Sequence, residues 1–170
     1  MKNKTSQATT GGKMTLQSTK QLPISISASH KSDVRTQFAA LCYRIKDKKP
    51  EILLITSRGS KRWIIPKGWP MDGKTPGESA LQEAWEEAGV RGKVIERCLG
   101  LYSYSKVLTP KKDLPCVAMI YPIKVKSLKR NYPEVGQRQR KWFTPKKAAA
   151  RVDEPELAQI LKTFDPRFLG

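Results

Sequence analysis

The chain has 170 residues, enough for one domain with a hydrophobic core, and its 33 Lys and Arg against 15 Asp and Glu give a net charge of +18. No run approaches the roughly 18 apolar residues that a membrane-spanning helix needs, so the sequence excludes an integral membrane protein of that kind. The positive charge favours a polyanionic partner: nucleic acid, an acidic membrane surface or a phosphate-rich small molecule. Composition does not choose among these three.

Cysteine usage indicates the compartment. Cys42, Cys98 and Cys116 are an odd and widely spaced set without a CxxC pair. This pattern argues against a disulfide scaffold and against a zinc site. We therefore expect a reducing compartment, the cytoplasm.

The first 32 residues differ from the rest of the chain. They contain five Lys and no acidic residue, and they are rich in Ser, Thr and Gln. Too few apolar residues are present to offset the entropy of ordering the segment. An organelle transit peptide is the alternative, but the segment has no Arg and no clear apolar face. We predict a disordered basic tail over residues 1–32, followed by one domain over residues 33–170.

Short apolar runs predict most of the remaining elements. The runs at residues 38–45 and 52–56 flank a charged turn, which is typical of a β-hairpin. Further strands are predicted over residues 62–66, 93–104, 116–125 and 140–143, and helices over residues 145–151 and 155–164. The mixed order and the excess of strands predict an α+β fold with a mixed or antiparallel sheet.

One helix has clear boundaries, over residues 76–88. Thr75 is suited to the N-cap, Pro76 to the first helical position, and Glu78 completes a capping box. Gly89 provides the stop. At about 100° per residue, one side of this helix is apolar and should face the core. That side is formed by Ala80, Leu81, Ala84, Trp85 and Ala88.

The other side of the same helix carries Glu83, Glu86 and Glu87. Spacings of three and four residues make these carboxylates neighbours that repel one another, and the C-terminal half of a helix disfavours negative charge. No basic residue within the helix relieves them. A solvated acidic face paired with distant Lys or Arg is one interpretation. A Mg²⁺ site is the other, and the unfavourable arrangement, about 1–2 kcal/mol, favours it.

The preceding loop permits a competing interpretation. Residues 68–75 match the phosphate-binding P-loop pattern G-x4-G-K-[ST]. However, Pro70 removes one of the backbone N–H groups that such a loop needs. No later strand leads into an Asp that could complete a magnesium site of that type. The sequence therefore disfavours a P-loop.

Residues 68–90 resemble the Nudix box, G-x5-E-x7-R-E-U-x-E-E-x-G-U, where U is aliphatic. Lys74 stands where the motif has its first Glu, and Gln82 stands where it has Arg. Over residues 36–165 the chain resembles the diphosphoinositol polyphosphate and diadenosine polyphosphate phosphohydrolase branch of the Nudix hydrolases. The matching positions of the box are Gly68, Glu83, Ala84, Glu86, Glu87, Gly89 and Val90.

The resemblance implies an α/β/α sandwich with a mixed sheet, and an enzyme in which metal-activated water attacks a phosphoanhydride. By position, Glu83, Glu86 and Glu87 would be the metal ligands and catalytic residues, with Mg²⁺ as the cofactor or Mn²⁺ in its place. One of them, or Glu134 outside the box, would activate the water. Gln82 can hydrogen bond to a neighbouring Glu but cannot form a charge-assisted pair.

Basic residues flank this helix, and each is suited either to solvent or to a substrate phosphate. As a group they indicate clamps for several phosphates. We expect the substrate to be a small-molecule polyphosphate, either a diadenosine polyphosphate or a diphosphoinositol polyphosphate. A catalytically weakened Nudix domain that binds RNA or phosphate ligands is the alternative, with nucleic acid as the second choice of partner. The predicted substrate-binding residues are Arg58, Arg62, Lys67, Gly68, Lys74, Arg138 and Arg140.

Overall fold

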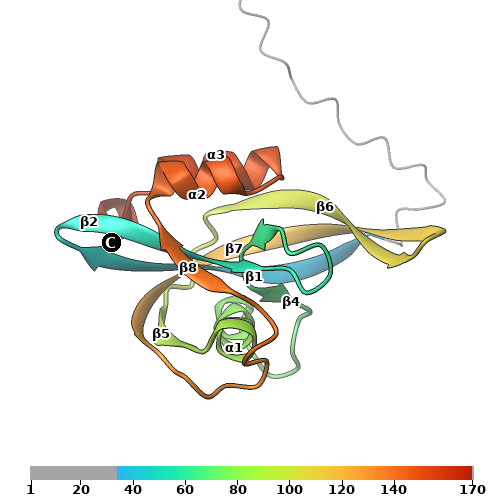
Figure 1. The fold of residues 1–170 in the computed structure, drawn as a ribbon, viewed down its shortest axis with the longest axis horizontal. Helices are drawn as coiled ribbons and strands as arrows, with labels where there is room; N and C mark the ends of the chain where they lie inside the picture. Colours follow the sequence, from blue (N-terminus) through green and yellow to red (C-terminus); the bar gives the residue numbers. More distant parts are fainter. Residues whose placement is uncertain (1–33, 170) are drawn as a thin grey trace, which may run out of the picture. The chain divides into compact units, whose positions relative to one another are not determined.

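The computed structural model describes residues 34–169, so the predicted tail over residues 1–32 lies outside the described residues. An eight-stranded mixed sheet runs through this part, with a path of β3-β2-β1-β7-β5 and with β4, β6 and β8 pairing with β1, β7 and β2 (Figure 1). The strands are β1 (Arg35–Lys46), β2 (Lys49–Thr56), β3 (Trp63–Ile64), β4 (Lys67–Gly68), β5 (Val90–Val94), β6 (Gly100–Thr109), β7 (Lys112–Leu128) and β8 (Arg140–Phe143). The helices are α1 (Pro76–Ala88), α2 (Pro145–Arg151), α3 (Pro155–Thr163) and the 3₁₀ helix η2 (Pro166–Leu169).

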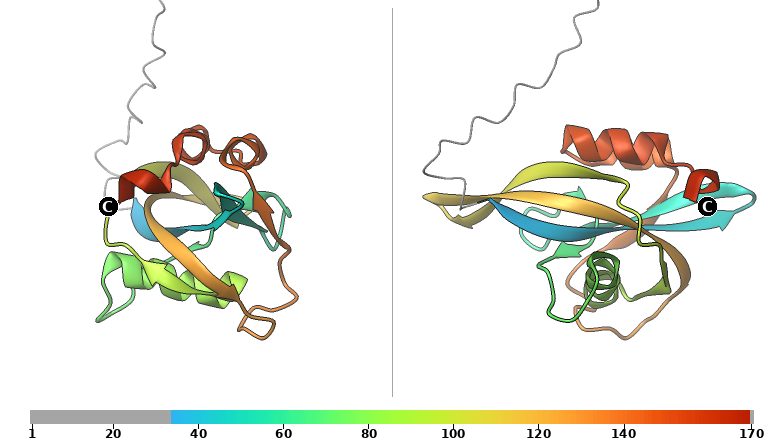
Figure 2. Two further views of the ribbon diagram at one scale, coloured as in Figure 1. Left: turned by 90° about the vertical axis from the view of Figure 1, so that its left-hand side faces the viewer. Right: turned by 180° about the vertical axis from the view of Figure 1, so that it is seen from behind.

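Both faces of the sheet are covered. Helix α1 packs on one face, and α2 and α3 pack on the other (Figures 1 and 2). Successive side chains of a strand point to opposite faces, so β1 supplies both cores. Ala39 and Leu41 belong to the core beneath α2 and α3, and Ala40 and Cys42 to the core above α1. The predicted α/β/α sandwich with a mixed sheet is confirmed.

The predicted hairpin of β1 and β2 is also confirmed. Its strands pair antiparallel up to Lys46 and Lys49, which lie opposite each other at the turn. The two turn residues, Asp47 and Lys48, have φ values of 50° and 65°. Two consecutive left-handed residues match the right-handed twist of the strands, which is why the tight turn closes here.

The single strand predicted over residues 93–104 is wrong. Two strands take its place, and they pair antiparallel with different parts of β7: Val94 lies opposite Ile123, and Gly100 opposite Ile120. Between them, Glu96 turns away from the sheet and accepts hydrogen bonds from the Thr75 hydroxyl and from the Gly77 N–H, at 3.1 Å for the latter. Glu96 thus provides hydrogen-bond acceptors for the N-terminus of α1, and the apolar run over residues 93–104 is interrupted at this point.

Helix α1 has the predicted limits, but its buried face is narrower than predicted. Ala80, Ala84 and Ala88 are fully buried. Leu81 and Trp85 are only half-buried, and the Trp85 ring lies 3.6 Å from the Arg91 guanidinium. The Ala side chains at spacing four lie closest to the sheet, and Leu81 packs against the same core as predicted, whereas Trp85 does not belong to that core.

None of the helices in residues 34–169 is long and apolar enough to cross a membrane. Cys42 and Cys116 are buried, Cys98 is exposed, and all three are free thiols. The cytoplasm as the compartment stays a prediction.

Gly89 ends α1 in the left-handed region, with φ of 67°. A Cβ there would lie 2.5 Å from the Tyr132 ring and 2.9 Å from the Lys129 carbonyl oxygen. We expect Gly89→Ala to lower the free energy of unfolding by about 2–4 kcal/mol, combining backbone strain with this overlap.

Gly73→Ala is the matched control, because Gly73 has φ of 74° but nothing within 4 Å of an added Cβ. It should destabilise by about 1 kcal/mol, the conformational part alone. Urea unfolding of both variants measures the difference. Equal losses would show that the packing around Gly89 is not close.

Candidate active site

The C-terminal half of α1 opens onto a cleft of about 520 Å³. Glu87 lines this cleft, although its side chain is only 9% exposed. The walls come from the loop after β2, from β4, from β6 and from the loop before β8. Basic side chains dominate these walls, namely Arg58, Arg62, Lys67, Lys106 and Arg138.

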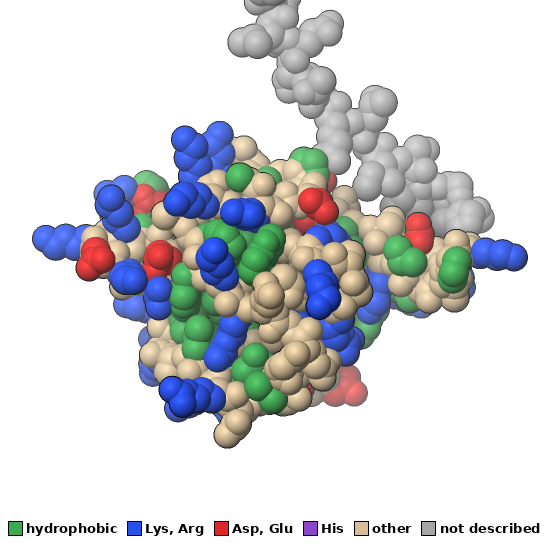
Figure 3. Space-filling model, viewed as in Figure 1, with side chains coloured by type: hydrophobic (Ala, Val, Ile, Leu, Met, Phe, Trp, Pro, Cys, Tyr) green, Lys and Arg blue, Asp and Glu red, His purple; other side chains and the backbone are tan. Residues whose placement is uncertain are grey.

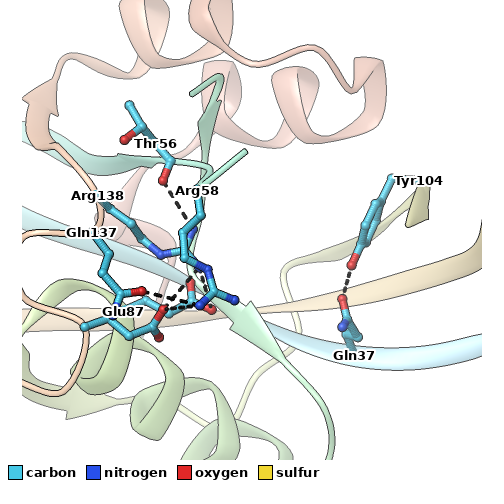
Figure 4. A network of polar contacts seen from close by, with 8 residues as sticks. Gln37, Thr56, Arg58, Glu87, Tyr104, Gln137 and Arg138 are labelled. Carbon is cyan, nitrogen blue, oxygen red and sulfur yellow. Dashed lines mark hydrogen bonds and ion pairs between the residues drawn. The ribbon is translucent and has the colours of Figure 1, made fainter. Parts of the chain in front are cut away.

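Two opposing effects act on the Glu87 carboxylate: burial, and attraction to nearby positive groups. The Lys67 backbone N–H donates a hydrogen bond to its carboxylate, and Arg138 Nη2 lies 3.9 Å from its Oε1 (Figure 4). Its other oxygen, Oε2, is buried without a hydrogen-bond partner. Burial outweighs the nearby positive charge of Arg138 and Lys67, and the pKa of Glu87 is raised to about 7.

Glu83 lies one turn earlier and is more strongly perturbed. Its carboxyl group packs directly against Gly68 of β4, where a Cβ of any other residue would overlap it. Burial, followed by the negative charges of Glu87, Glu86 and Glu134, raises the pKa of Glu83 to about 8. Gly68 therefore acts through its lack of a side chain, which lets this carboxyl group approach the sheet.

A fourth carboxylate joins this group from another part of the chain. The Glu134 backbone N–H donates to the Glu86 carbonyl oxygen at 3.0 Å, which fixes the loop before β8 against α1. Arg138 Nη2 lies 3.4 Å from Glu134 Oε1. Glu134, expected from the resemblance to be a candidate, is therefore brought beside the carboxylates of α1.

These contacts correct one premise of the sequence interpretation. Helix α1 contains no relieving cation, but Arg138 and Lys67 reach Glu87 from distant segments. The compensation is partial, since the pKa values of Glu83 and Glu87 remain raised. The interpretation of a simple solvated face also fails for Glu87, because that side chain is buried.

This group of carboxylates suits a hard divalent cation. Within residues 34–169, no three Asp, Glu, His or Cys side chains already surround a common point. Mg²⁺ requires only one or two carboxylates when substrate phosphate oxygens and waters complete its coordination. The unpartnered Glu87 Oε2 and the raised pKa values mark oxygens that a cation would stabilise. The chemistry of Glu83 and Glu87 is therefore compatible with such an ion, and Glu86 as a third ligand stays a prediction.

Four of the predicted substrate-binding residues line the cleft: Arg58, Arg62, Lys67 and Arg138. Two others point elsewhere. Lys74 lines a separate small pocket between α1 and β5. Arg140 donates from Nη1 to the Ala88 carbonyl oxygen at 2.7 Å, so its guanidinium satisfies the C-terminus of α1 and does not line the cleft.

Arg62 is fixed by a buried acid. Its Nη1 lies 2.6 Å from Glu154 Oε1 and 3.7 Å from Asp153 Oδ2. Glu154 is buried, whereas a third of the Arg62 side chain is exposed. The pair joins the cleft wall to the loop before α3. It holds a guanidinium at the cleft without requiring a substrate to order it.

Sequence reasoning missed the wall contributed by β6. The Tyr104 hydroxyl donates a hydrogen bond to Gln37 Oε1 (Figure 4). Lys67 Nζ lies 4.8 Å from the Tyr104 ring centroid. Lys106 Nζ lies 5.0 Å from the Trp69 ring, whose residue is 39% exposed. Tyr104 and Lys106 lie far in sequence from Gln37, Lys67 and Trp69 and share no motif with them. The pairing of β6 with β7 brings Tyr104 and Lys106 to the cleft.

The P-loop interpretation is excluded by what occupies the N-terminus of α1. A P-loop binds phosphate at that point, but here the Glu96 carboxylate accepts from the Gly77 N–H. Thr75 Oγ1 accepts from the Glu78 N–H at 3.1 Å as an ordinary N-cap. In addition, the strand that leads into this loop, β4, pairs antiparallel with β1, so it is not part of a parallel strand pair.

Comparison with known families gives a match to the NUDIX domain over residues 35–164. The chain belongs to the Nudix family. Among curated relatives, it is 35% identical to mitochondrial Nudix hydrolase 12 of Arabidopsis thaliana over 119 residues, which is 68% of this chain and 59% of that protein. It is also 35% identical to human diphosphoinositol polyphosphate phosphohydrolase 3-alpha over 109 residues, 62% of this chain and 61% of that protein.

The chain therefore spans about three fifths of the length of these relatives. Among solved structures, the Caenorhabditis elegans Ap4A hydrolase superposes with a TM-score of 0.56 at 22% identity, covering 81% of this chain and 99% of that one. The Escherichia coli dihydroneopterin triphosphate pyrophosphohydrolase gives 0.57 at 16% identity, over 79% and 94%. These two structures support the Nudix fold.

The departures from the Nudix box have local consequences. Gln82 Nε2 donates to Glu86 Oε1 at 3.1 Å, so the amide orients this Glu through a neutral hydrogen bond. Lys74 lines the same small pocket as Gln82, on the side of α1 that faces away from Glu87. The two replacements are therefore neighbours, and neither removes a carboxylate from the cleft.

The raised pKa of Glu83 predicts how stability responds to pH. An acid whose folded pKa is about 8, against an ordinary 4.5, binds more protons folded than unfolded between these values, so stability falls as pH rises through that window. With EDTA present, we expect the wild type to lose stability between about pH 5 and 9.

Glu83→Gln removes this titration, and after allowance for solvent screening it should be about 1–2 kcal/mol more stable than the wild type at the alkaline end. Thermal unfolding at several pH values measures this, with Glu78→Gln as the exposed control on the same helix. Parallel curves for wild type and Glu83→Gln would contradict the assignment.

Proposed function

We propose that this Nudix protein is a Mg²⁺-dependent hydrolase that cleaves a phosphoanhydride bond in a polyphosphorylated small molecule. One observation carries the proposal: a buried acid, Glu87, opens into a cleft whose other charged side chains are all basic. Carboxylates can bind a metal ion, and the basic side chains around them can bind phosphates. Together they are complementary to a polyphosphate that carries a bound metal ion.

Different residues would bind the metal ion, accept a proton and stabilise the phosphoryl charge. Glu83, Glu86 and Glu87 would hold the ion, and a bound Mg²⁺ would polarise a phosphoryl oxygen and favour deprotonation of water. Glu134 would accept the proton of the attacking water, whose oxygen bonds to phosphorus as the bridging P–O bond breaks. Arg58, like Arg62 and Lys67 on the same walls, would stabilise the charge that builds on the phosphoryl oxygens.

The substrate we propose carries several adjacent phosphates. The cleft walls hold five cations, more than a single phosphate can use. Figure 3 shows one face of the molecule with basic side chains spread widely and few acidic ones among them. Diadenosine polyphosphates and diphosphoinositol polyphosphates fit this charge. The names of the human relative and of the C. elegans structure give further support.

Glu86→Gln and Glu87→Gln test the mechanism. Either change removes a charge from the proposed metal site, and we expect kcat to fall by a factor of roughly 10² or more. Glu78→Gln should retain wild-type turnover, because Glu78 lines the separate pocket beside α1. Product analysis over a panel of polyphosphates with Mg²⁺ provides the assay. Full activity in both site variants would reject the mechanism.

A second candidate function rests on a different surface. Six exposed cations occur on β5, at the end of β7 and just after it, and no acid accompanies them between residues 123 and 133. Lys93 and Lys124 lie directly opposite each other, a pairing of like charges that destabilises a sheet by itself. Such a basic surface favours nucleic-acid binding. The cations are Arg91, Lys93, Lys124, Lys126, Lys129 and Arg130.

RNA binding by this surface should depend steeply on salt, because phosphate contacts release counterions. Lys93→Glu with Lys124→Glu should weaken binding of a single-stranded RNA by at least about tenfold at low salt. The control is Lys46→Glu with Lys48→Glu in the β1–β2 turn, which changes net charge equally. Equal effects of both double variants would indicate net charge alone, and tight RNA binding without turnover of any polyphosphate would favour a binding module.

A further inference from the structure

Arg138 occupies the space between two of the carboxylates described above. Its Nη2 lies 3.4 Å from Glu134 Oε1 and 3.9 Å from Glu87 Oε1, and its side chain is only 8% exposed (Figure 4). A guanidinium does not lose its proton in a protein, so this positive charge is permanent. Arg138 therefore compensates part of the negative charge of Glu87 and Glu134.

The contacts of this guanidinium are incomplete. Nη1 donates to the Thr56 carbonyl oxygen at 3.2 Å, but Nε is buried without a partner. Both carboxylate distances exceed the roughly 2.7–2.9 Å of a strong charge-assisted hydrogen bond. Glu87 Oε2 is also buried and unpaired. Buried charges with unmade hydrogen bonds are unfavourable, so an alternative arrangement of the same groups would be readily adopted.

Other cations nearby act on these carboxylates more weakly. Arg58 Nη1 lies 3.6 Å from Glu134 Oε1, but its side chain is 63% exposed and solvent screens the pair. The positive charge of Lys67 also acts on Glu87, but less strongly than that of Arg138, and the Lys67 backbone N–H makes a contact that a metal ion would not need to break. Arg138 also lines the cleft where phosphates would bind. It is thus in contact with both halves of the site.

We propose that Arg138 is a built-in counter-ion that competes with the divalent cation for Glu87 and Glu134, and that a bound polyphosphate draws its guanidinium away from them. This inference rests on the proposed function. Without substrate, the resident charge weakens metal binding. With substrate, arginine gains phosphate oxygens as partners and the carboxylates become free for the ion. Metal and polyphosphate then bind with positive coupling, each strengthening the other.

Manganese binding to the full chain tests the competition without relying on turnover. Free Mn²⁺ is measured by electron paramagnetic resonance in the absence of any phosphate compound. We expect Arg138→Met to bind Mn²⁺ roughly tenfold more tightly than the wild type, the size of a typical coupling between charged sites. Arg62→Met is the matched control: the same change in the same cleft, in a residue paired with Glu154 instead. It should leave Mn²⁺ affinity within about twofold of the wild type.

Removal of Arg138 takes one positive partner away from the buried Glu87 and from Glu134, so folding is checked by circular dichroism, and Arg138→Gln serves as a second variant that keeps a donor for the Thr56 carbonyl. Mn²⁺ should raise the Tm of either folded variant by more than it raises that of the wild type. Wild-type or weaker Mn²⁺ affinity in the Arg138 variants would overturn the inference and leave the proposed function standing. Absence of Mn²⁺ binding in every protein would overturn both.

The substrate side of the coupling has its own measurement. Methylenebisphosphonate, a polyphosphate mimic that resists hydrolysis, is titrated calorimetrically with and without saturating Mg²⁺. The gain in its affinity on adding Mg²⁺ should be larger in the wild type than in Arg138→Met, because only the wild type has a guanidinium to release. An equal gain in both would show that Arg138 does not link the two ligands.

Discussion

The site depends on one electrostatic constraint: several carboxylates are crowded at the end of a helix and partly removed from water. Glu83, Glu86 and Glu87 are unfavourable where they lie, because their mutual repulsion adds to the helix dipole and to burial. The fold tolerates them through Arg138 and the Lys67 backbone N–H. These compensations are partial, since the pKa values of Glu83 and Glu87 remain raised.

The rest of the fold explains why this cluster stays in place. Ala80, Ala84 and Ala88 let α1 lie close to the sheet, and Gly68 leaves room for a carboxyl group beside β4. Arg140 satisfies the last turn of the helix at the Ala88 carbonyl. A short, well-capped helix fixed at both ends presents its acids with little freedom, so the backbone positions of these acids are set before any ligand binds.

Local signals in the sequence predicted the parts of the structure that local physics decides. Thr75, Pro76 and Gly89 defined α1 because caps act within a few residues, and two apolar runs around a charged turn defined the hairpin of β1 and β2. The interruption between β5 and β6 could not be predicted. It depends on Glu96 reaching the N-terminus of α1, a contact across 19 residues that leaves no periodic trace. The wall of the cleft formed by Tyr104 and Lys106 depends on strand pairing for the same reason.

The basic residues show why the location of a binding site cannot be deduced from composition alone. Arg58, Arg62, Lys74 and Arg140 read alike in the sequence, as cations near an acidic helix. The structure gives them four different surroundings: an exposed pair with Glu134, a buried pair with Glu154, a separate pocket and a helix C-terminus. Only a cation whose partners leave it facing the cleft can bind a phosphate there. The role of each basic residue therefore depends on the geometry of its own contacts. Some guanidinium groups stabilise the fold, and others line the cleft.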